Sequence, residues 1–186
     1  MCIRDSPYIG LARLYIKMEE FDKAQITIKK LKNIDHKPLL IAKGDFYMEL
    51  GDAFWQKSSY VAALKQYKIA LFFYKKVDSE KANMAITGIL DCYSKLASKH
   101  FMENKIQLSI QDLETALIYK NTPVINYKLA LLYQDVDVFE SVKYMEKTYG
   151  EEAGKRIIAT GTVGSSLETL CTKYGYTFLE FPLNVG

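Results

Sequence analysis

The sequence is poor in the residues that build chemical centres, with three cysteines, two histidines and one tryptophan among 186 residues. The cysteines form no CxxC pair, so we expect reduced thiols, as in a cytoplasmic protein. His36 and His100 stand alone, without the helical spacing of a metal motif such as HExxH. No Ser-His-Asp or Cys-His set has a second supporting signal. We therefore predict no catalytic residue, no metal site and no cofactor, and we do not expect an enzyme.

Long apolar runs are also missing. The longest, Ile69 to Tyr74, is ended by Lys75-Lys76 and falls well short of the roughly 18 residues that a membrane-spanning helix needs. The net charge is only +3, and the lysines are spread along the chain rather than gathered in a stripe, so nucleic acid is not an expected partner. No secretory signal is visible. These absences predict a cytoplasmic protein that binds neither membrane nor nucleic acid.

What the sequence does contain is a pattern of small and large apolar residues at helical steps, clearest in residues 48–71. Gly51 lies one helical turn before Phe54. After a short turn, Ala63, Tyr67 and Ala70 follow at four- and three-residue steps. Small residues at such steps let two antiparallel helices approach closely, and the large ones fill the gap between them. The pattern predicts a closely packed helix pair.

The same arrangement recurs in three other segments of the chain. The small residue near the start of each second helix is, in chain order, Ala24, Ala63, Ser109 and Ser141. The first helices carry the pairs Leu11-Ala12, Leu50-Gly51, Leu96-Ala97 and Leu129-Ala130. This recurrence resembles the tetratricopeptide repeat family, in which helix pairs of about 34 residues stack on one another. The resemblance covers residues 7–149.

The resemblance implies a mainly α fold, an α-α superhelix of tandem helix pairs. The expected repeats are residues 7–34, 37–77, 79–120 and 123–149. Their helices are expected at residues 7–18 and 21–33, 38–57 and 59–77, 80–101 and 105–120, and 123–134 and 137–149. The spacing of the anchors in the middle of the chain exceeds the usual repeat length of about 34 residues. Extended helices near residues 38–57 and 80–102 account for the difference.

Local signals mark several helix ends. Ser58-Ser59 is expected to cap the helix that follows it. Thr122 is expected as an N-cap, with Pro123 at the first helical position. Two glycines fall inside the expected helix 38–57. Gly51 has a reason, since it occupies the close-packing position, whereas Gly44 is expected to weaken the helix by up to about 1 kcal/mol and to mark a bend.

Both ends of the chain depart from the repeat pattern. Residues 1–6, Met-Cys-Ile-Arg-Asp-Ser, match the translation of a transposon-adapter sequence used in making sequencing libraries, and we interpret them as foreign to the protein. The first repeat then starts at once, without the polar capping helix that repeat arrays usually need for solubility. We expect an internal fragment of a longer protein, with an apolar edge near Ile9 and Leu14 that promotes self-association.

Residues 150–186 follow a different pattern. Residues 155–160 and 177–181 are predicted strands. Residues 166–174 between them are a predicted helix that begins at a capping box and ends at a glycine. Strand, loop, helix and strand predict a short βαβ-like tail rather than a fifth repeat.

This tail is similar to an internal stretch of glucose-6-phosphate isomerase, a family that interconverts glucose 6-phosphate and fructose 6-phosphate without a cofactor. The similar residues include Tyr144-Met145-Glu146-Lys147-Thr148-Tyr149-Gly150, Glu151-Glu152-Ala153, Lys155-Arg156-Ile157, Ala159-Thr160, Gly175-Tyr176 and Val185-Gly186. The similarity stops before the glycine-arginine step of that family's active-site segment, and Leu183-Asn184 replaces an expected acidic pair. No catalytic residue is therefore carried over. Chance similarity, a true fusion and a chimaeric assembly are three open explanations.

A tetratricopeptide superhelix presents its first helices on the concave face, and the usual function of that family is binding. The outward positions on the first helices include Arg13, Lys17, Asp52, Trp55, Gln56, Ser98, Phe101, Tyr127 and Gln134. Such a groove would hold a protein or peptide partner through its aromatic side chains. Trp55 and Phe101 have an alternative role in packing between neighbouring helices.

The resemblance thus predicts a scaffold or adaptor that binds a peptide or protein partner in its groove. Some family members clamp a terminal carboxylate with lysine and asparagine. Here the corresponding places hold Arg13, Asp52 and Ser98, so that clamp is not expected. The alternative function is that of an inactive fragment of a sugar-phosphate isomerase-like enzyme, fused or mis-joined to the repeats.

Overall fold

The computed structural model describes residues 7–31, 36–134 and 136–150. Within these ranges the chain is mainly helical, with eight α-helices and no strand. The helices are α1 (Pro7–Lys17), α2 (Phe21–Lys29), α3 (Lys37–Gln56), α4 (Tyr60–Lys76), α5 (Ala82–Met102), α6 (Ile106–Tyr119), α7 (Pro123–Tyr133) and α8 (Val138–Tyr149). The βαβ-like tail predicted from residue 150 onward lies outside the described residues apart from Gly150 itself.

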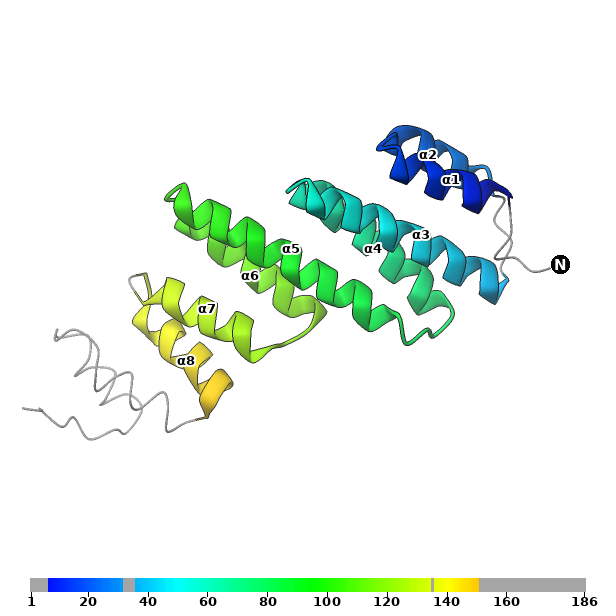
Figure 1. Cartoon of the computed structure of the whole chain (residues 1–186). Coiled ribbons are helices and arrows are strands. Elements are labelled where there is room, and N and C mark those ends of the chain that lie inside the picture. The colour runs from blue at the N-terminus through cyan, green and yellow to red at the C-terminus, as the bar shows by residue number, and fades with distance from the viewer. Residues whose placement is uncertain (1–6, 32–35, 135, 151–186) are drawn as a thin grey trace, which may run out of the picture. The chain divides into compact units, whose positions relative to one another are not determined.

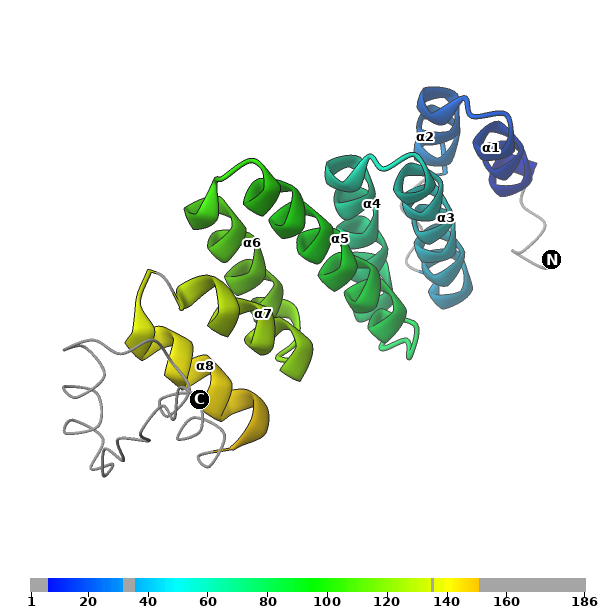
Figure 2. The same cartoon turned by 60° about the vertical axis from the view of Figure 1, so that its left-hand side comes forward.

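The chain divides into two compact units, residues 1–103 and residues 104–186. The N-terminal unit contains the helices from α1 to α5. In this unit α1 packs on α2, α3 packs on α4 and α1, and α4 packs on α5 (Figures 1 and 2). In the C-terminal unit α7 packs on both α6 and α8. The division falls inside the repeat expected at residues 79–120.

The small residues that were predicted to anchor the second helices are all buried. They are Ala24, Ala63, Ser109 and Ser141, the most exposed of which retains 3% of its surface. Ser141 also has a polar role, since its hydroxyl donates a hydrogen bond of 2.7 Å to the Ala130 carbonyl. Because such a bond needs the backbone of α7 within reach of a short side chain on α8, it confirms the close approach predicted for this helix pair.

Two copies of one interaction join α3 to α4. In the first copy the Tyr67 ring lies on the backbone of Gly51, where a Cβ atom would lie 2.6 Å from Tyr67 Cε1. The Tyr67 hydroxyl donates a hydrogen bond of 2.7 Å to Asp52 Oδ1. The glycine therefore makes room for the ring, and the next residue along α3 accepts from its hydroxyl.

The second copy is displaced by seven residues, or two helical turns, along each helix. A Cβ atom at Gly44 would lie 2.5 Å from Tyr74 Cε1, and the Tyr74 hydroxyl donates to Asp45 Oδ1 over 2.7 Å. Asp45 also pairs with the Lys81 ammonium at 2.7 Å. Gly44 thus has the same packing role as Gly51, a role that the sequence analysis did not assign to it.

The turns that end α1, α3 and α4 share one backbone conformation. Each contains a left-handed residue that is not glycine: Glu19 (φ 60°), Ser58 (φ 57°) and Asp78 (φ 50°). In each turn the amide of this residue donates to the carbonyl three residues earlier, and the next amide donates to the carbonyl five residues before it. This is the Schellman arrangement, which satisfies carbonyls that the helix end leaves free.

Two capping predictions have different outcomes. Thr122 is the N-cap of α7 and its side chain accepts from the Ile125 amide, with Pro123 following at the first helical position, as predicted. The prediction for Ser58-Ser59 is wrong in its mechanism. Ser59 is the N-cap residue of α4 but its side chain accepts no capping hydrogen bond, and Ser58 takes the left-handed conformation that closes α3.

Replacing Ser58 with glycine is expected to stabilise the protein by about 1 kcal/mol. A Cβ atom in the left-handed region costs roughly 1–2 kcal/mol, part of which is returned by the greater freedom of glycine in the unfolded chain. Urea unfolding followed by circular dichroism would measure the gain. Ser58→Ala is the matched control, since it removes the hydroxyl and keeps the Cβ atom. Equal gains in both variants would contradict the backbone explanation.

The apolar edge predicted near Ile9 and Leu14 needs a correction. Leu14 is 51% exposed, but Ile9 is only 1% exposed. Ile9 lies one turn before Ala12, and these two are the buried residues of α1, which contacts α2 and α3. Ile9 therefore belongs to the core. The exposed apolar residues of α1 are instead Tyr8, Leu11 and Leu14.

Candidate groove on the first helices

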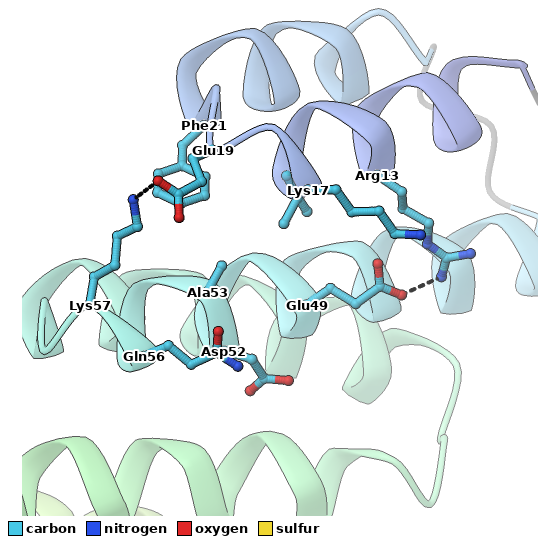
Figure 3. Close-up of a pocket in the computed structure, with 10 residues that line it drawn as sticks. Arg13, Lys17, Glu19, Phe21, Glu49, Asp52, Ala53, Gln56 and Lys57 are labelled. Carbon is cyan, nitrogen blue, oxygen red and sulfur yellow. Dashed lines mark hydrogen bonds and ion pairs between the residues drawn. The ribbon is translucent and has the colours of Figure 1, made fainter.

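Two hollows flank α3 in the N-terminal unit. The first, called here the α1–α3 hollow, has a volume of about 640 Å³ (Figure 3). Its lining includes Arg13 and Lys17 from α1, Glu19 from the turn after α1, and Phe21 from the start of α2. Glu49, Asp52 and Gln56 of α3, with Lys57 directly after α3, complete the charged and polar lining. The second, the α3–α5 hollow, has a volume of about 460 Å³. Asp52 lines both hollows.

Charged pairs span the α1–α3 hollow at two places. Arg13 Nη2 lies 2.7 Å from Glu49 Oε1, and the Lys57 ammonium pairs with the Glu19 carboxylate (Figure 3). All four side chains are partly exposed, so each pair contributes about 0–1 kcal/mol to stability. Burial raises the pKa of the Glu49 carboxyl, and the Arg13 guanidinium only partly offsets that rise. The two pairs therefore connect α1 and the turn after it to α3, but they add little to the free energy of unfolding.

Lys17 is the remaining cation of this hollow. Figure 3 shows its side chain reaching along the α1 side of the hollow towards Arg13. Within the described part of the chain, the Lys17 ammonium has no hydrogen-bond or ion-pair partner. An exposed ammonium without a partner costs little in water, and it can pair with a carboxylate of a bound molecule without first breaking another interaction.

Asp52 borders both hollows, but its carboxylate serves the side of α3 away from α1. In Figure 3 its carboxylate points away from α1, and its Oδ1 atom accepts the hydrogen bond from the Tyr67 hydroxyl. The α3–α5 hollow is lined by Met48, Asp52 and Trp55 of α3, by Tyr67 of α4, and by Met84, Thr87, Gly88 and Asp91 of α5. Its walls thus combine two carboxylates with large apolar side chains.

Trp55 packs against a neighbouring helix and also lines a hollow. Its ring packs edge-on against Tyr60, with the ring centroids 4.9 Å apart, as the packing interpretation predicts. The side chain stays partly exposed and lines the α3–α5 hollow. The contact with Tyr60 limits the orientations of the ring, which lowers the entropy that a partner would have to remove on binding.

The structure brings together five of the nine predicted groove residues along α1 and α3: Arg13, Lys17, Asp52, Trp55 and Gln56. Ser98 and Phe101 lie near the end of α5 and line neither hollow. The Ser98 hydroxyl donates to the Ser94 carbonyl over 2.9 Å, and Phe101 is 55% exposed. Tyr127 and Gln134 belong to the C-terminal unit.

The sequence interpretation missed residues that the structure adds to these hollows, namely Glu49, Met84, Thr87 and Asp91. Glu49 could have been found, because it lies three residues before Asp52 on the same side of a helix. The α5 residues lie on the face that continues, in steps of three and four, to the predicted Ser98 and Phe101. The sequence alone does not show that the N-terminal part of this face borders a hollow while the part with Ser98 and Phe101 does not, because that depends on tertiary packing.

Comparison with known proteins adds no identity: no protein-family model matches the chain, and no curated protein sequence matches it either. No helix within the described ranges is both long and apolar enough to cross a membrane. The described residues likewise contain no group of three or more His, Cys, Asp and Glu side chains placed to hold a metal ion.

Proposed function

We propose that this protein is a helical-repeat scaffold of the cytoplasm, of the tetratricopeptide kind, which binds an extended or helical segment of a protein partner along α1, α3 and α5. The observation that supports the proposal is the pair of hollows on either side of α3, which contain five of the residues predicted for a groove. Buried Ala24, Ala63, Ser109 and Ser141 support the repeat register from which those residues were predicted.

The character of the surface also favours a polypeptide ligand. The hollows carry separate cations, carboxylates and apolar side chains rather than one convergent cluster, and they are open to solvent. A peptide offers alternating side chains of different chemistry at regular spacing, and can occupy neighbouring hollows at once. The isomerase-like alternative rests almost entirely on residues 151–186, outside the described residues.

A randomised peptide library displayed on phage, selected against the immobilised chain, tests the proposal. The selected peptides are expected to bind the double variant Lys17→Ala/Gln56→Ala at least about tenfold more weakly than the wild type, which corresponds to about 1.4 kcal/mol. Lys17 and Gln56 are exposed side chains that line the α1–α3 hollow, so their loss should leave the fold intact. Isothermal titration calorimetry would measure both affinities.

The matched control is Lys29→Ala/Lys65→Ala, which removes two exposed side chains from the second helices α2 and α4. This control should bind the selected peptides as the wild type does. Peptides that bind the Lys17→Ala/Gln56→Ala variant undiminished would place their site elsewhere and overturn the groove. A selection that enriches no binding peptide would overturn the proposal as well.

A further inference from the structure

Resting on the proposed groove, we infer that the α3–α5 hollow receives a lysine or arginine side chain of the bound segment. The charges of its lining carry the inference. Asp52 stands on one wall and Asp91 on the other, and none of the residues that line this hollow is a lysine or arginine. A cationic side chain entering here would meet carboxylates from two helices, whereas an acidic one would meet only like charge.

The hydrogen bond to Asp52 leaves that carboxylate able to accept more. The Tyr67 hydroxyl donates to Oδ1 at 2.7 Å, and an ionised carboxylate has about four lone-pair positions on its two oxygens. Burial and the nearby Asp52 carboxylate raise the pKa of Tyr67, so the hydroxyl keeps its proton at neutral pH. Tyr67 therefore fixes the orientation of Asp52 without neutralising its charge.

The apolar walls suit the stem of the same side chain. Met48 and Trp55 from α3 and Met84 from α5 line the hollow, and Met84 is 60% exposed. Lysine and arginine bury their methylene chains along apolar surface while the charged head reaches a polar group. The Trp55 ring adds a face to which a guanidinium or ammonium is attracted. A purely polar or purely apolar side chain would use only half of this lining.

The neighbouring α1–α3 hollow gives the contrast. Its lining has three cations and three carboxylates, and two of the cations, Arg13 and Lys57, are already paired with Glu49 and Glu19. It therefore has no excess of either charge. The charged residues that line the α3–α5 hollow are both carboxylates, so the two sites differ in the partner side chain that they favour.

Nuclear magnetic resonance of a chain labelled at its methionine methyl groups tests the inference. The probes are three capped peptides, acetyl-Ala-Ala-Xaa-Ala-Ala-amide, in which Xaa is arginine, its neutral isostere citrulline, or glutamate. The arginine peptide is expected to shift the signals of Met48 and Met84 in a saturable way. It should leave unmoved those of Met18 and Met102, which are exposed and line neither hollow. The citrulline and glutamate peptides should bind at least about fivefold more weakly.

Asp52→Asn should weaken the arginine peptide by a similar factor of about five, and its amide oxygen can still accept from Tyr67. Asp22→Asn, at an exposed position on α2, is the control and should change nothing. If all three peptides shift Met48 and Met84 with equal affinity, the preference for a cation is overturned while the groove stands. If none shifts them, the cation site is overturned. The groove itself is tested separately by the phage-display selection with the Lys17→Ala/Gln56→Ala variant.

Discussion

Gly51→Ala is expected to destabilise the N-terminal unit by about 2 kcal/mol, although alanine is the better helix former. The new Cβ atom would lie 2.6 Å from Tyr67 Cε1, well inside van der Waals contact. Overpacking of this kind costs about 1–3 kcal/mol, and displacing the ring also weakens its hydroxyl hydrogen bond, worth about 1 kcal/mol. The helix propensity of alanine returns only about 1 kcal/mol, so the net effect is a loss.

The Tyr67 ring cannot simply move away from α3. Its opposite edge faces the backbone of α5, where a Cβ atom at Gly88 would lie 3.0 Å from Tyr67 Cδ2. The ring thus lies between two glycines, on α3 and α5, while its hydroxyl is held by Asp52. Relief of the clash requires a shift of a helix, which is why we expect the variant to lose stability rather than to repack.

Urea unfolding followed by circular dichroism would measure the loss, with Gly10→Ala as the control. Gly10 lies inside α1, and a Cβ atom there would meet nothing within 4 Å. The same substitution at Gly10 should therefore stabilise the protein by up to about 1 kcal/mol. In the double variant Gly51→Ala/Tyr67→Leu the losses should not add, because the smaller side chain removes the clash. A Gly51→Ala variant as stable as the wild type would refute the packing argument.

Gly44 illustrates what the sequence could and could not predict. The helical steps around Gly51 and around Tyr67 predict a close approach of their two helices with large side chains in the gap, and the structure confirms it. The second contact, between Gly44 and Tyr74, involves residues that lie seven positions from Gly51 and from Tyr67 in the sequence. Recognising it requires the alignment of α3 against α4, namely that Gly51 lies opposite Tyr67. In an antiparallel pair, seven residues towards the start of α3 then match seven residues towards the end of α4.

The groove residues show the same limit. Helical periodicity places Arg13 and Lys17 on one face of α1, and Asp52 and Gln56 on one side of α3, and these four do line a common hollow. Periodicity cannot say how far along a helix its neighbour stays in contact. Phe101 therefore shares a face with residues of the α3–α5 hollow without lining it. Distances between helices depend on the packed side chains, which local pattern does not specify.

Alkaline conditions are expected to destabilise the N-terminal unit steeply, by up to about 4 kcal/mol for each pH unit above about pH 10. Three buried acids with strongly raised pKa values contribute most. Burial raises the pKa of the Cys92 thiol to about 12, and burial followed by the Asp52 and Asp45 carboxylates raises the pKa values of Tyr67 and Tyr74. All three side chains are at most 3% exposed in the folded chain.

The sign of the effect follows from proton counts. In the unfolded chain a thiol ionises near pH 8.5 and a phenol near pH 10, whereas the folded chain holds these protons to higher pH. The unfolded state therefore binds fewer protons than the folded state above about pH 9, and stability falls as the pH rises, by about 1.4 kcal/mol per unit for each group. Lys43 acts in the opposite direction, because burial lowers its pKa. Its effect is confined to pH values below the unfolded lysine pKa of about 10.4, since above that pH both states have lost the proton.

Urea unfolding in the presence of a reductant, at about pH 8, about pH 10 and about pH 11, would measure the slope. Tyr74→Phe should be less stable than the wild type at the lowest pH by about 1 kcal/mol, since it loses the hydrogen bond to Asp45. It should nevertheless lose stability less steeply, because one of the three acids is gone. Tyr8→Phe, at a position that is 46% exposed, should keep the wild-type slope. A stability that stays level up to the highest pH, or equal slopes in wild type and Tyr74→Phe, would show that the two buried hydroxyls do not hold their protons as this packing requires.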